Sequence, residues 1–327
     1  MNILVVRTDK LGDFITSLPA MYALKQHSPK NRIIACVAPL NKELALACTS
    51  SLVEGGFIDE VIVDDGLGLW SLVKKLRHVQ ADVSITLFSN TRVALAQFLA
   101  GIPKRIAPAT KIAQIFYTDR VKQRRSEVKM AEFEYNLELT KALFPSINLE
   151  YKKPLLAFSD SKNIYELFCT NYNIDKEIIA FHVGFGGSSD ANWNLDEYEI
   201  LIRAVLKQEK YQVVLTFGPD EVKLCEEMQG RLQKEAVLFY ISTEGKVVFA
   251  KLISNFKLFV STSTGTFHLA SLVGTPTMTF FAASLFASSK RWKGVGDEKL
   301  QQNFMIPHAK DERVKLFESV KKRLSAV

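Results

Sequence analysis

The chain has 327 residues, of which 47% are hydrophobic, and a formal net charge of +7. With no long polar tract, it is large enough for two domains with their own cores, which we favour over a single domain. Its apolar runs are too short to span a membrane, and residues 2–6 form a strand-like start in place of a signal peptide, so we expect a cytosolic protein. Four cysteines without CxxC or Cys/His spacing predict reduced thiols, with neither zinc nor a disulfide.

The positive charge lies mainly in the first half of the chain. Residues 1–155 carry 21 Lys and Arg against 15 Asp and Glu, whereas the remainder carries 21 against 20. The excess is strongest within residues 101–130, where it would create a local field that attracts an anion. No zinc-finger, RNP or basic-zipper motif accompanies it, so nucleic acid is not the expected partner. A charged small substrate, an anionic membrane surface and an ordinary solvated basic face all fit.

The first half alternates strand-like and helix-like segments. This alternation predicts right-handed βαβ crossovers and a mostly parallel sheet, that is, an α/β fold. The expected strands are 2–6, 32–37, 60–63, 82–88 and 104–107, the last of them at the sheet edge. The expected helices are 13–27, 42–48, 70–79, 91–99 and 132–143.

The same rhythm restarts after a polar, proline-containing segment, so we expect domains at residues 1–153 and 154–309. The expected strands of the second half are 177–182, 212–217, 237–241 and two more within 258–281; the expected helices are 163–171, 195–208, 220–230 and 246–254. Residues 310–327 predict an amphipathic helix with an apolar side formed by Val314, Leu316, Phe317, Val320 and Leu324. Such a helix either packs back across the domains, which its regular apolar face favours, or contacts anionic lipid through its basic residues.

Three loops that follow strands carry the candidate chemistry, because two α/β domains in tandem place ligand sites at strand carboxyl ends that face the cleft between them. In the first loop, Asp13 follows a glycine at the start of a helix. It is either an N-cap or a carboxylate able to accept a proton from a substrate hydroxyl. The second loop, residues 182–193, is rich in glycine, which allows close backbone approach to an anion. It lacks the dinucleotide fingerprint, and no Walker lysine motif is present.

The third loop lies within residues 258–281, where a buried-type strand runs into a Ser/Thr/Gly turn, a short helix and a second strand. The turn would direct unpaired N–H groups and the positive end of the helix dipole at one spot, which suits a phosphate. Alternatively, Ser263 or Thr264 is only an N-cap. His268, in the first turns of the helix, is either a packed or capping residue or a catalyst, and a pKa lowered by the helix N-terminus would leave it neutral.

Together these loops resemble one family, the lipopolysaccharide heptosyltransferases of glycosyltransferase family 9, over nearly the whole chain. The matching motifs are R-T-D-K-L-G-D at 7–13 with S-L-P at 17–19, L-F-S-N-T-R at 87–92, R-R-S at 124–126 with E-Y-N at 134–136, G-G-S at 186–188 with N-W at 192–193, and S-T-G-x-x-H-L-A at 263–270 with G-T-P-T at 274–277. The last motif is the most specific.

The resemblance implies a GT-B fold of two Rossmann-like domains, the first binding the acceptor and the second the nucleotide sugar. It implies inverting transfer of heptose from ADP-heptose to a Kdo or heptose acceptor, without a catalytic metal or other cofactor, on the cytoplasmic face of a Gram-negative inner membrane. Asp13 would be the catalytic base. The donor would be bound by Gly186, Gly187, Ser188, Ser263, Thr264, Gly265 and His268, and the anionic acceptor by Arg7, Lys10, Arg92, Arg124 and Arg125.

The chain departs from the family pattern at the donor site. Ser263 stands where an acidic residue commonly contacts the donor sugar, and Ala191 replaces a basic residue near the donor diphosphate. The usual F-G-P-T is altered at residues 281–284. Lys290, Arg291 or Lys293 are candidates to replace the lost positive charge. These departures keep two alternatives open: transfer of a different nucleotide-activated sugar, and a nucleotide-binding protein without catalysis.

Overall fold

The computed structural model describes residues 1–49, 55–109, 112–184 and 192–327. The chain divides into two compact units, Met1–Lys152 and Lys153–Val327. All four cysteines are free. None of the helices in the described part of the chain is long and apolar enough to cross a membrane.

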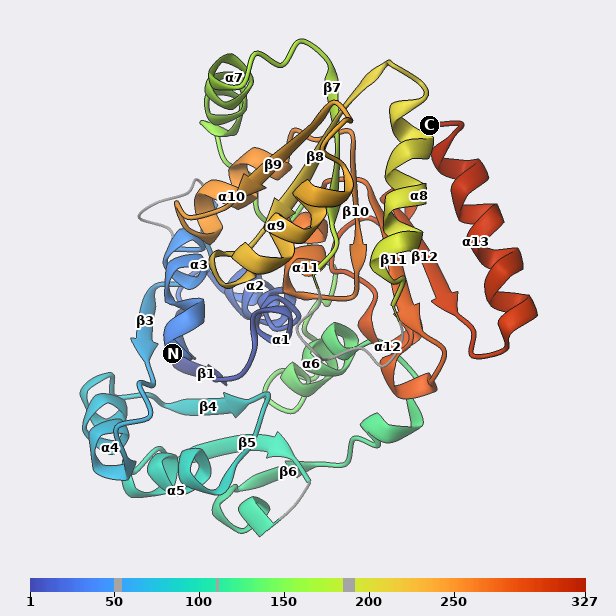
Figure 1. Cartoon of the computed structure of the whole chain (residues 1–327). Helices are drawn as coiled ribbons and strands as arrows, with labels where there is room; N and C mark the ends of the chain where they lie inside the picture. Colours follow the sequence, from blue (N-terminus) through green and yellow to red (C-terminus); the bar gives the residue numbers. More distant parts are fainter. Residues whose placement is uncertain (50–54, 110–111, 185–191) are drawn as a thin grey trace. The chain divides into compact units, whose positions relative to one another are not determined.

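In the described residues of the first unit, six strands form one parallel sheet in the order β3-β2-β1-β4-β5-β6 (Figure 1). The strands are β1 (Asn2–Arg7), β2 (Arg32–Val37), β3 (Glu60–Val63), β4 (Val83–Thr86), β5 (Lys104–Pro108) and β6 (Asp119–Val121). The helices are α1 (Leu11–Ile15), α2 (Leu18–His27), η1 (Pro39–Asn41), α3 (Lys42–Ala47), α4 (Leu69–His78), α5 (Thr91–Leu99), η2 (Ile112–Phe116), η3 (Arg125–Glu127) and α6 (Glu132–Thr140).

The second unit repeats this topology. In its described residues the parallel sheet has the order β12-β11-β10-β7-β8-β9. The strands are β7 (Glu177–His182), β8 (Tyr211–Phe217), β9 (Val237–Ile241), β10 (Leu258–Thr262), β11 (Thr277–Ala282) and β12 (Gln301–Ile306). The helices are α7 (Ser161–Asn171), α8 (Leu195–Leu206), η4 (Pro219–Glu221), α9 (Val222–Arg231), α10 (Lys246–Ile253), α11 (Gly265–Leu272), η5 (Leu285–Ala287), α12 (Ser289–Trp292), η6 (Glu298–Leu300) and α13 (Lys310–Leu324).

Both sheets have the doubly wound order in which the chain runs outward from a central strand and then returns to its other side. The order reverses between β1 and β4 in the first unit and between β7 and β10 in the second. Ligands of such sheets bind beyond the carboxyl ends of the strands at this switch point. The candidate loops at residues 7–13, 87–92, 182–193 and 263–268 all follow one of these four strands.

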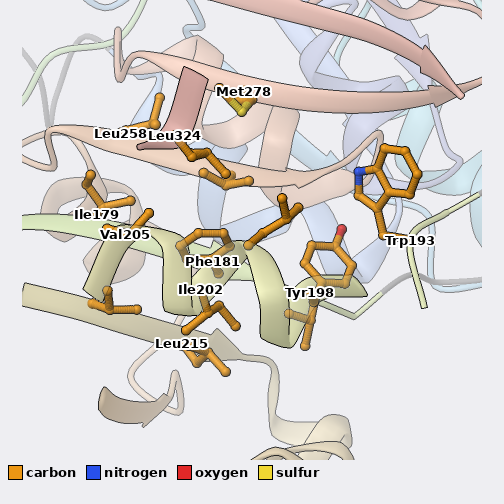
Figure 2. Packing of buried hydrophobic residues seen from close by; sticks show 14 of the residues in the cluster. Ile179, Phe181, Trp193, Tyr198, Ile202, Val205, Leu215, Leu258, Met278 and Leu324 are labelled. Atoms are coloured by element: carbon orange, nitrogen blue, oxygen red, sulfur yellow. The ribbon is translucent and has the colours of Figure 1, made fainter. Parts of the chain in front are cut away.

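The cores are built from strands that are apolar on both faces, as parallel strands covered by helices must be. Figure 2 shows the core of the second unit, where Phe181 of β7, Leu215 of β8 and Met278 of β11 pack with Ile202 and Val205 of α8. The C-terminal helix α13 belongs to this core through Phe317, Val320 and Leu324. Its apolar face therefore packs within the second unit. Val314, which we expected on that face, is instead 55% exposed.

The expected α/β alternation and parallel sheets are confirmed, and the errors lie at edges and turns. Strand β6 was not predicted, so β5 is not an edge strand as we expected. Strand β12 was not predicted either. Both are edge strands with polar residues, D-R-V and Q-Q-N, which give no strand-like pattern. The expected helix 13–27 is two helices, because α1 ends at Ile15 and α2 begins anew with Pro19 in its first turn.

Candidate functional site

A buried arginine organises the end of β1. Arg7 is only 2% exposed. Its Nε donates to Oδ1 of Asp9 at 2.8 Å and its Nη2 to Oδ1 of Asp13 at 2.6 Å. Its Nη1 donates to the carbonyl of Leu87, just after β4, at 3.3 Å. The planar fork of donors on the guanidinium therefore connects the two strand ends at the switch point of the first unit.

A third carboxylate reaches this cluster from α6. Oε1 of Glu132 lies 3.6 Å from Nη1 of Arg7 and also accepts a hydrogen bond from Arg125. The guanidinium of Arg125 lies 5.6 Å from the centre of the Tyr135 ring. We call Arg7, Asp9, Asp13, Arg125 and Glu132 the Arg7 network. Its charges are largely buried and paired, because an unpaired buried charge would be strongly destabilising.

Burial also changes the proton affinities in the Arg7 network. Burial raises the pKa of Asp9 to about 6; the charge of Arg7 opposes this shift and that of Asp13 adds to it. For Arg7, burial disfavours the charged form, but the attraction of Asp9, Asp13 and Glu132 outweighs it, and the pKa of Arg7 is raised. Arg7 therefore remains a cation, whereas Asp9 titrates in the mildly acidic range.

Asp13 is the most exposed carboxylate of the Arg7 network. It is the third residue of α1 rather than its N-cap, a position that Lys10 occupies. Its side chain is 22% exposed, and Arg7 holds Oδ1, so that among the described residues Oδ2 has no partner. Two hydrogen bonds to backbone carbonyls hold this turn in place. Oγ1 of Thr16 donates to the carbonyl of Asp13, and Nδ2 of Asn136 donates to the carbonyl of Thr16. An oriented, accessible carboxylate of this kind can act as a general base.

The predicted acceptor-binding cations lie in different environments. Arg7 and Arg125 belong to the network around Asp13, so they position it instead of presenting a free charge. Arg92, on α5, forms an ion pair with buried Asp64 and lies apart from the network. Lys10 is exposed next to Asp13. The structure leaves the binding roles of all five cations as predictions.

Arg124 is the predicted cation that opens onto a pocket. Its side chain is 80% exposed and pairs with Glu127. The pocket has a volume of about 410 Å³, which is within the usual range for small-ligand sites. Its lining residues are Val121, Lys122, Gln123, Arg124, Glu127, Lys129, Met130, Tyr135 and Glu138. The three cations Lys122, Arg124 and Lys129 outnumber the carboxylates Glu127 and Glu138, so we call this the basic pocket. Glu127 pairs with both Arg124 and Lys129.

A second candidate site, in the second unit, lies where β10 leads into α11. Thr264 is the N-cap in extended geometry, and its side chain caps no N–H group. Its own N–H donates to the carbonyl of Thr262 at 2.8 Å, so it is not available to a ligand, contrary to our expectation for the Thr264 and Gly265 pair. The first helical N–H groups, from Gly265, Thr266 and Phe267, have no acceptor within the helix. Together with the helix dipole, N–H groups at such a helix start can bind an anion.

His268 lies behind this helix start in an apolar environment. It is 3% exposed, and its Nδ1 has no hydrogen-bond partner among the described residues. Burial lowers the pKa of His268 to about 4, so the ring is neutral at physiological pH. The ring packs against Phe267 and edge-on against Trp292, whose ring centre is 6.3 Å away. A neutral imidazole can form hydrogen bonds, but this Nδ1 is fully buried, so a ligand would reach it only after the side chains around it moved.

Ser263, between β10 and α11, contributes no charge to this candidate site. Its N–H donates to the carbonyl of Phe280, and its side chain is half-buried. Of the cations considered as substitutes, Lys290 is exposed and Lys293 pairs with Glu298 at 2.7 Å. Arg291 is buried, with its guanidinium 3.7 Å from the centre of the Phe286 ring and 4.9 Å from that of Trp292. Through Trp292, Arg291 is the cation that is linked by packing to His268.

The predicted glycine-loop residues Gly186, Gly187 and Ser188, and also Ala191, lie outside the described residues. The strand before this loop ends at buried His182, whose Nδ1 is 2.9 Å from the carbonyl of Thr216. A Cβ on Gly184 would lie 1.9 Å from Oε1 of Glu221, so a larger residue here would require the Glu221 side chain to move. Glu221 itself accepts the N–H of Gly218 at 2.6 Å.

Several residues of the two candidate sites were not predicted from the sequence. Asp9 is separated from Arg7 by one residue and could have been found as part of the same turn. Glu132 and Glu221 gave no signal, because each meets its partners only through the fold. Among the described residues no group of three or more His, Cys, Asp or Glu is placed to hold a metal ion.

Comparisons with known proteins identify the family and the fold. The family model described as "Glycosyltransferase family 9 (heptosyltransferase)" matches residues 69–319. A Haemophilus influenzae protein named "Putative glycosyltransferase" is 34% identical over 326 residues, which cover 96% of this chain and 92% of that protein.

Solved structures share the fold. The structure of Escherichia coli ADP-heptose LPS heptosyltransferase II has a TM-score of 0.77 at 18% identity and covers 99% of each chain. An E. coli heptosyltransferase solved with ADP has a TM-score of 0.71 at 19% identity, covering 98% of this chain and 100% of that one. The two-domain α/β architecture is therefore the GT-B fold, as the sequence motifs implied.

Proposed function

This chain belongs to glycosyltransferase family 9, and from that premise we propose that it transfers heptose from ADP-heptose to the inner core of lipopolysaccharide or lipooligosaccharide with inversion. The observation that supports this most directly is Asp13, a partly exposed carboxylate held by a buried arginine at the end of β1. The acceptor hydroxyl on Kdo or heptose would give its proton to Asp13. Its oxygen would attack C1 of the donor sugar as the bond from C1 to the ADP oxygen breaks.

The leaving ADP gains negative charge on its diphosphate, and the start of α11 is suited to stabilise it. The N–H groups of Gly265 and Thr266 would donate to phosphate oxygens, with the helix dipole adding to the effect. We also propose His268 as a donor-binding residue, which requires the packing around its buried Nδ1 to open when the donor binds. We propose that catalysis needs no metal or other cofactor, so that activity survives a chelator.

The anionic acceptor would bind to the basic pocket around Arg124. Kdo carboxylates and core phosphates are acceptors for charge-assisted hydrogen bonds, and Lys122, Arg124 and Lys129 line the pocket. Arg125 would contribute indirectly, because its guanidinium is engaged by Glu132. The enzyme would then act on the cytoplasmic face of a Gram-negative inner membrane, with no nucleic acid partner.

Ser263 supports a second candidate function, transfer of a different nucleotide-activated sugar. The helix start that would bind a diphosphate is complete, whereas the turn before it offers a hydroxyl where a carboxylate would contact the sugar. The site is therefore better matched to the nucleotide end of the donor than to a particular sugar.

A panel of sugar nucleotides separates these candidates. A donor that binds the folded state raises the melting temperature, so ADP-heptose should give the largest increase if our proposal is right. ADP should then be released when a Kdo-bearing acceptor is added. A larger increase with another sugar nucleotide, followed by turnover of it, would replace heptose as the donor. Binding without release of nucleotide on any acceptor would instead indicate a protein that has lost catalysis.

A further inference from the structure

An apolar projection stands on the surface of the first unit next to the edge of its sheet. The 3₁₀ turn η2 (Ile112–Phe116) carries Ile112, which is 77% exposed, and Ile115, which is 62% exposed. Residues at i and i+3 of a 3₁₀ helix lie on the same side, so the two side chains project together. Phe98, at the end of α5, is 50% exposed. We call Phe98, Ile112 and Ile115 the apolar knob.

The apolar knob is held by packing beneath it. Ala113 and Tyr117 are buried in a small cluster with Ala94 and Ala107, and the Phe116 ring lies 5.9 Å from that of Phe98. Nε of Arg105 donates to the carbonyl of Phe116 at 2.7 Å, and its guanidinium lies 5.5 Å from the centre of the Phe98 ring. The fold therefore fixes these apolar side chains in exposed positions.

Cations lie on the strands beside the apolar knob. Lys104 on β5 is 41% exposed, and its Nζ lies 3.9 Å from Oδ1 of Asp119 on β6; Arg120 on β6 is exposed, and its Nε donates to the carbonyl of Tyr117 at 3.4 Å. Exposed Lys122 follows directly after β6. Apolar side chains flanked by Lys and Arg are the combination with which peripheral proteins enter the boundary of an anionic bilayer.

We propose that the apolar knob docks this protein on an anionic lipid bilayer, with Ile112 and Ile115 entering the interface and the neighbouring cations contacting lipid headgroups. A second copy of the chain fits this surface less well, because a two-fold contact would place one basic rim against another. This docking surface rests on the proposed function, and it would also account for the position of the basic pocket. Val121, the last residue of β6, lines the basic pocket, so docking would bring that pocket to the lipid surface.

Vesicle binding by the full chain tests this inference. Wild type should sediment with vesicles that contain phosphatidylglycerol, more weakly at high salt, and should bind poorly to pure phosphatidylcholine. The double variant Ile112→Ser with Ile115→Ser should reduce binding about tenfold or more, since it removes apolar surface from the interface. The matched control changes two exposed aliphatic residues of the second unit, Ile200→Ser with Val314→Ser, and should bind as wild type does. Melting temperatures of both variants check that they fold.

Three results would overturn the inference: equal binding of the double variant and wild type, equal binding to neutral and anionic vesicles, or a wild-type dimer that the double variant abolishes. The vesicle assay contains neither donor nor acceptor, so its failure leaves the proposed sugar transfer untouched. Conversely, the double variant should release ADP at the wild-type rate with a water-soluble acceptor and more slowly with an acceptor in vesicles. Equal slowing on both acceptors would also contradict a role in docking.

Discussion

The candidate chemistry lies after two strands, β1 and β10, each at the switch point of its sheet. The two sheets have the same topology, but the polar groups at these strand ends differ in how they are paired. After β1, Arg7 meets three carboxylates, and nearly every charge is already paired. After β10, the turn from Thr262 to His268 contains no charged side chain at physiological pH. The N–H groups of Gly265, Thr266 and Phe267 have no acceptor within the helix, and among the described residues the buried Nδ1 of His268 has no partner.

This difference indicates different roles for the two ends. A pre-paired network fixes the orientation of Asp13 before any substrate arrives, and such preorganisation is what a general base requires. A helix start with unused donors instead gains its missing partners from an anionic ligand. We therefore expect changes after β1 to affect stability and the chemical step, and changes after β10 to affect ligand affinity.

The largest effect should come from Asp13→Asn. The amide can still accept a hydrogen bond from Arg7, but it cannot take a proton from the acceptor, so kcat should fall by about 10²–10⁴-fold. ADP release at saturating donor and acceptor measures this loss, and an unchanged melting temperature excludes unfolding.

Asp9→Asn is the matched control for Asp13→Asn, because both carboxylates pair with Arg7. It should lower kcat less than about tenfold, since Asp9 is in our proposal a positioning residue rather than the base. Equal losses in the two variants would show that Asp13 acts only through Arg7.

Arg7→Met should have the next largest effect, on stability. It leaves Asp9, Asp13 and Glu132 without their shared cation, and breaking a buried ion pair typically costs about 3–5 kcal/mol. Urea denaturation at pH 7 measures this loss. Arg231 also contacts three carboxylates, Asp196, Glu199 and Glu227, but its side chain is 29% exposed. Arg231→Met should therefore cost under about 1 kcal/mol, and similar losses for both variants would contradict the importance of burial at Arg7.

The sequence was informative where chemistry is local. Residues 7–13 and 263–268 are short turns after apolar strands, and their hydroxyl, glycine and carboxylate residues predict a ligand site whatever the rest of the chain does. The alternation of strands and helices likewise predicted the parallel sheets, because buried parallel strands need uninterrupted apolar runs. We did not predict the edge strands β6 and β12, because their polar sequences lack the apolar run of a buried strand. They are strands because each pairs with a neighbouring strand.

Contacts between distant residues could not be predicted. Arg92 was expected to be an acceptor-binding cation, and no local feature indicates its pairing with Asp64. Arg125 and Arg124 are adjacent in sequence, yet one joins the Arg7 network and the other opens onto a pocket. The sequence indicates which charges are present, whereas the fold decides which of them are paired.

The pH dependence of stability tests the environment of Asp9. Its pKa rises from 3.8 in the unfolded chain to about 6 in the folded protein. The folded state thus holds this proton more tightly, and the stability that Asp9 contributes is present below its unfolded pKa and lost as the pH rises through its folded pKa. Relative to Asp9→Asn, wild type should lose about 1–3 kcal/mol of unfolding free energy between about pH 4 and pH 6.5.

Asp65 provides the control for this titration. It is exposed, and its hydrogen bond from Lys75 lowers its pKa, so its contribution should change in the opposite direction and be lost as the pH falls. Urea midpoints of wild type, Asp9→Asn and Asp65→Asn, measured across the pH range, would show these opposite changes in unfolding free energy. A wild-type to Asp9→Asn difference that does not vary with pH would contradict the buried environment of Asp9.

The smallest effect, on donor affinity, should come from Gly265→Pro. Gly265 is the first residue of α11, where proline fits the helix, and Thr264 before it has φ −125° and ψ 177°, which a following proline tolerates. The substitution removes one N–H group and keeps the helix. If that group donates to the diphosphate, ADP should bind about tenfold more weakly in calorimetry. Gly265→Ala keeps the N–H and should bind as wild type does. Equal affinities of the proline and alanine variants would place the diphosphate elsewhere and remove the contrast between the two strand ends.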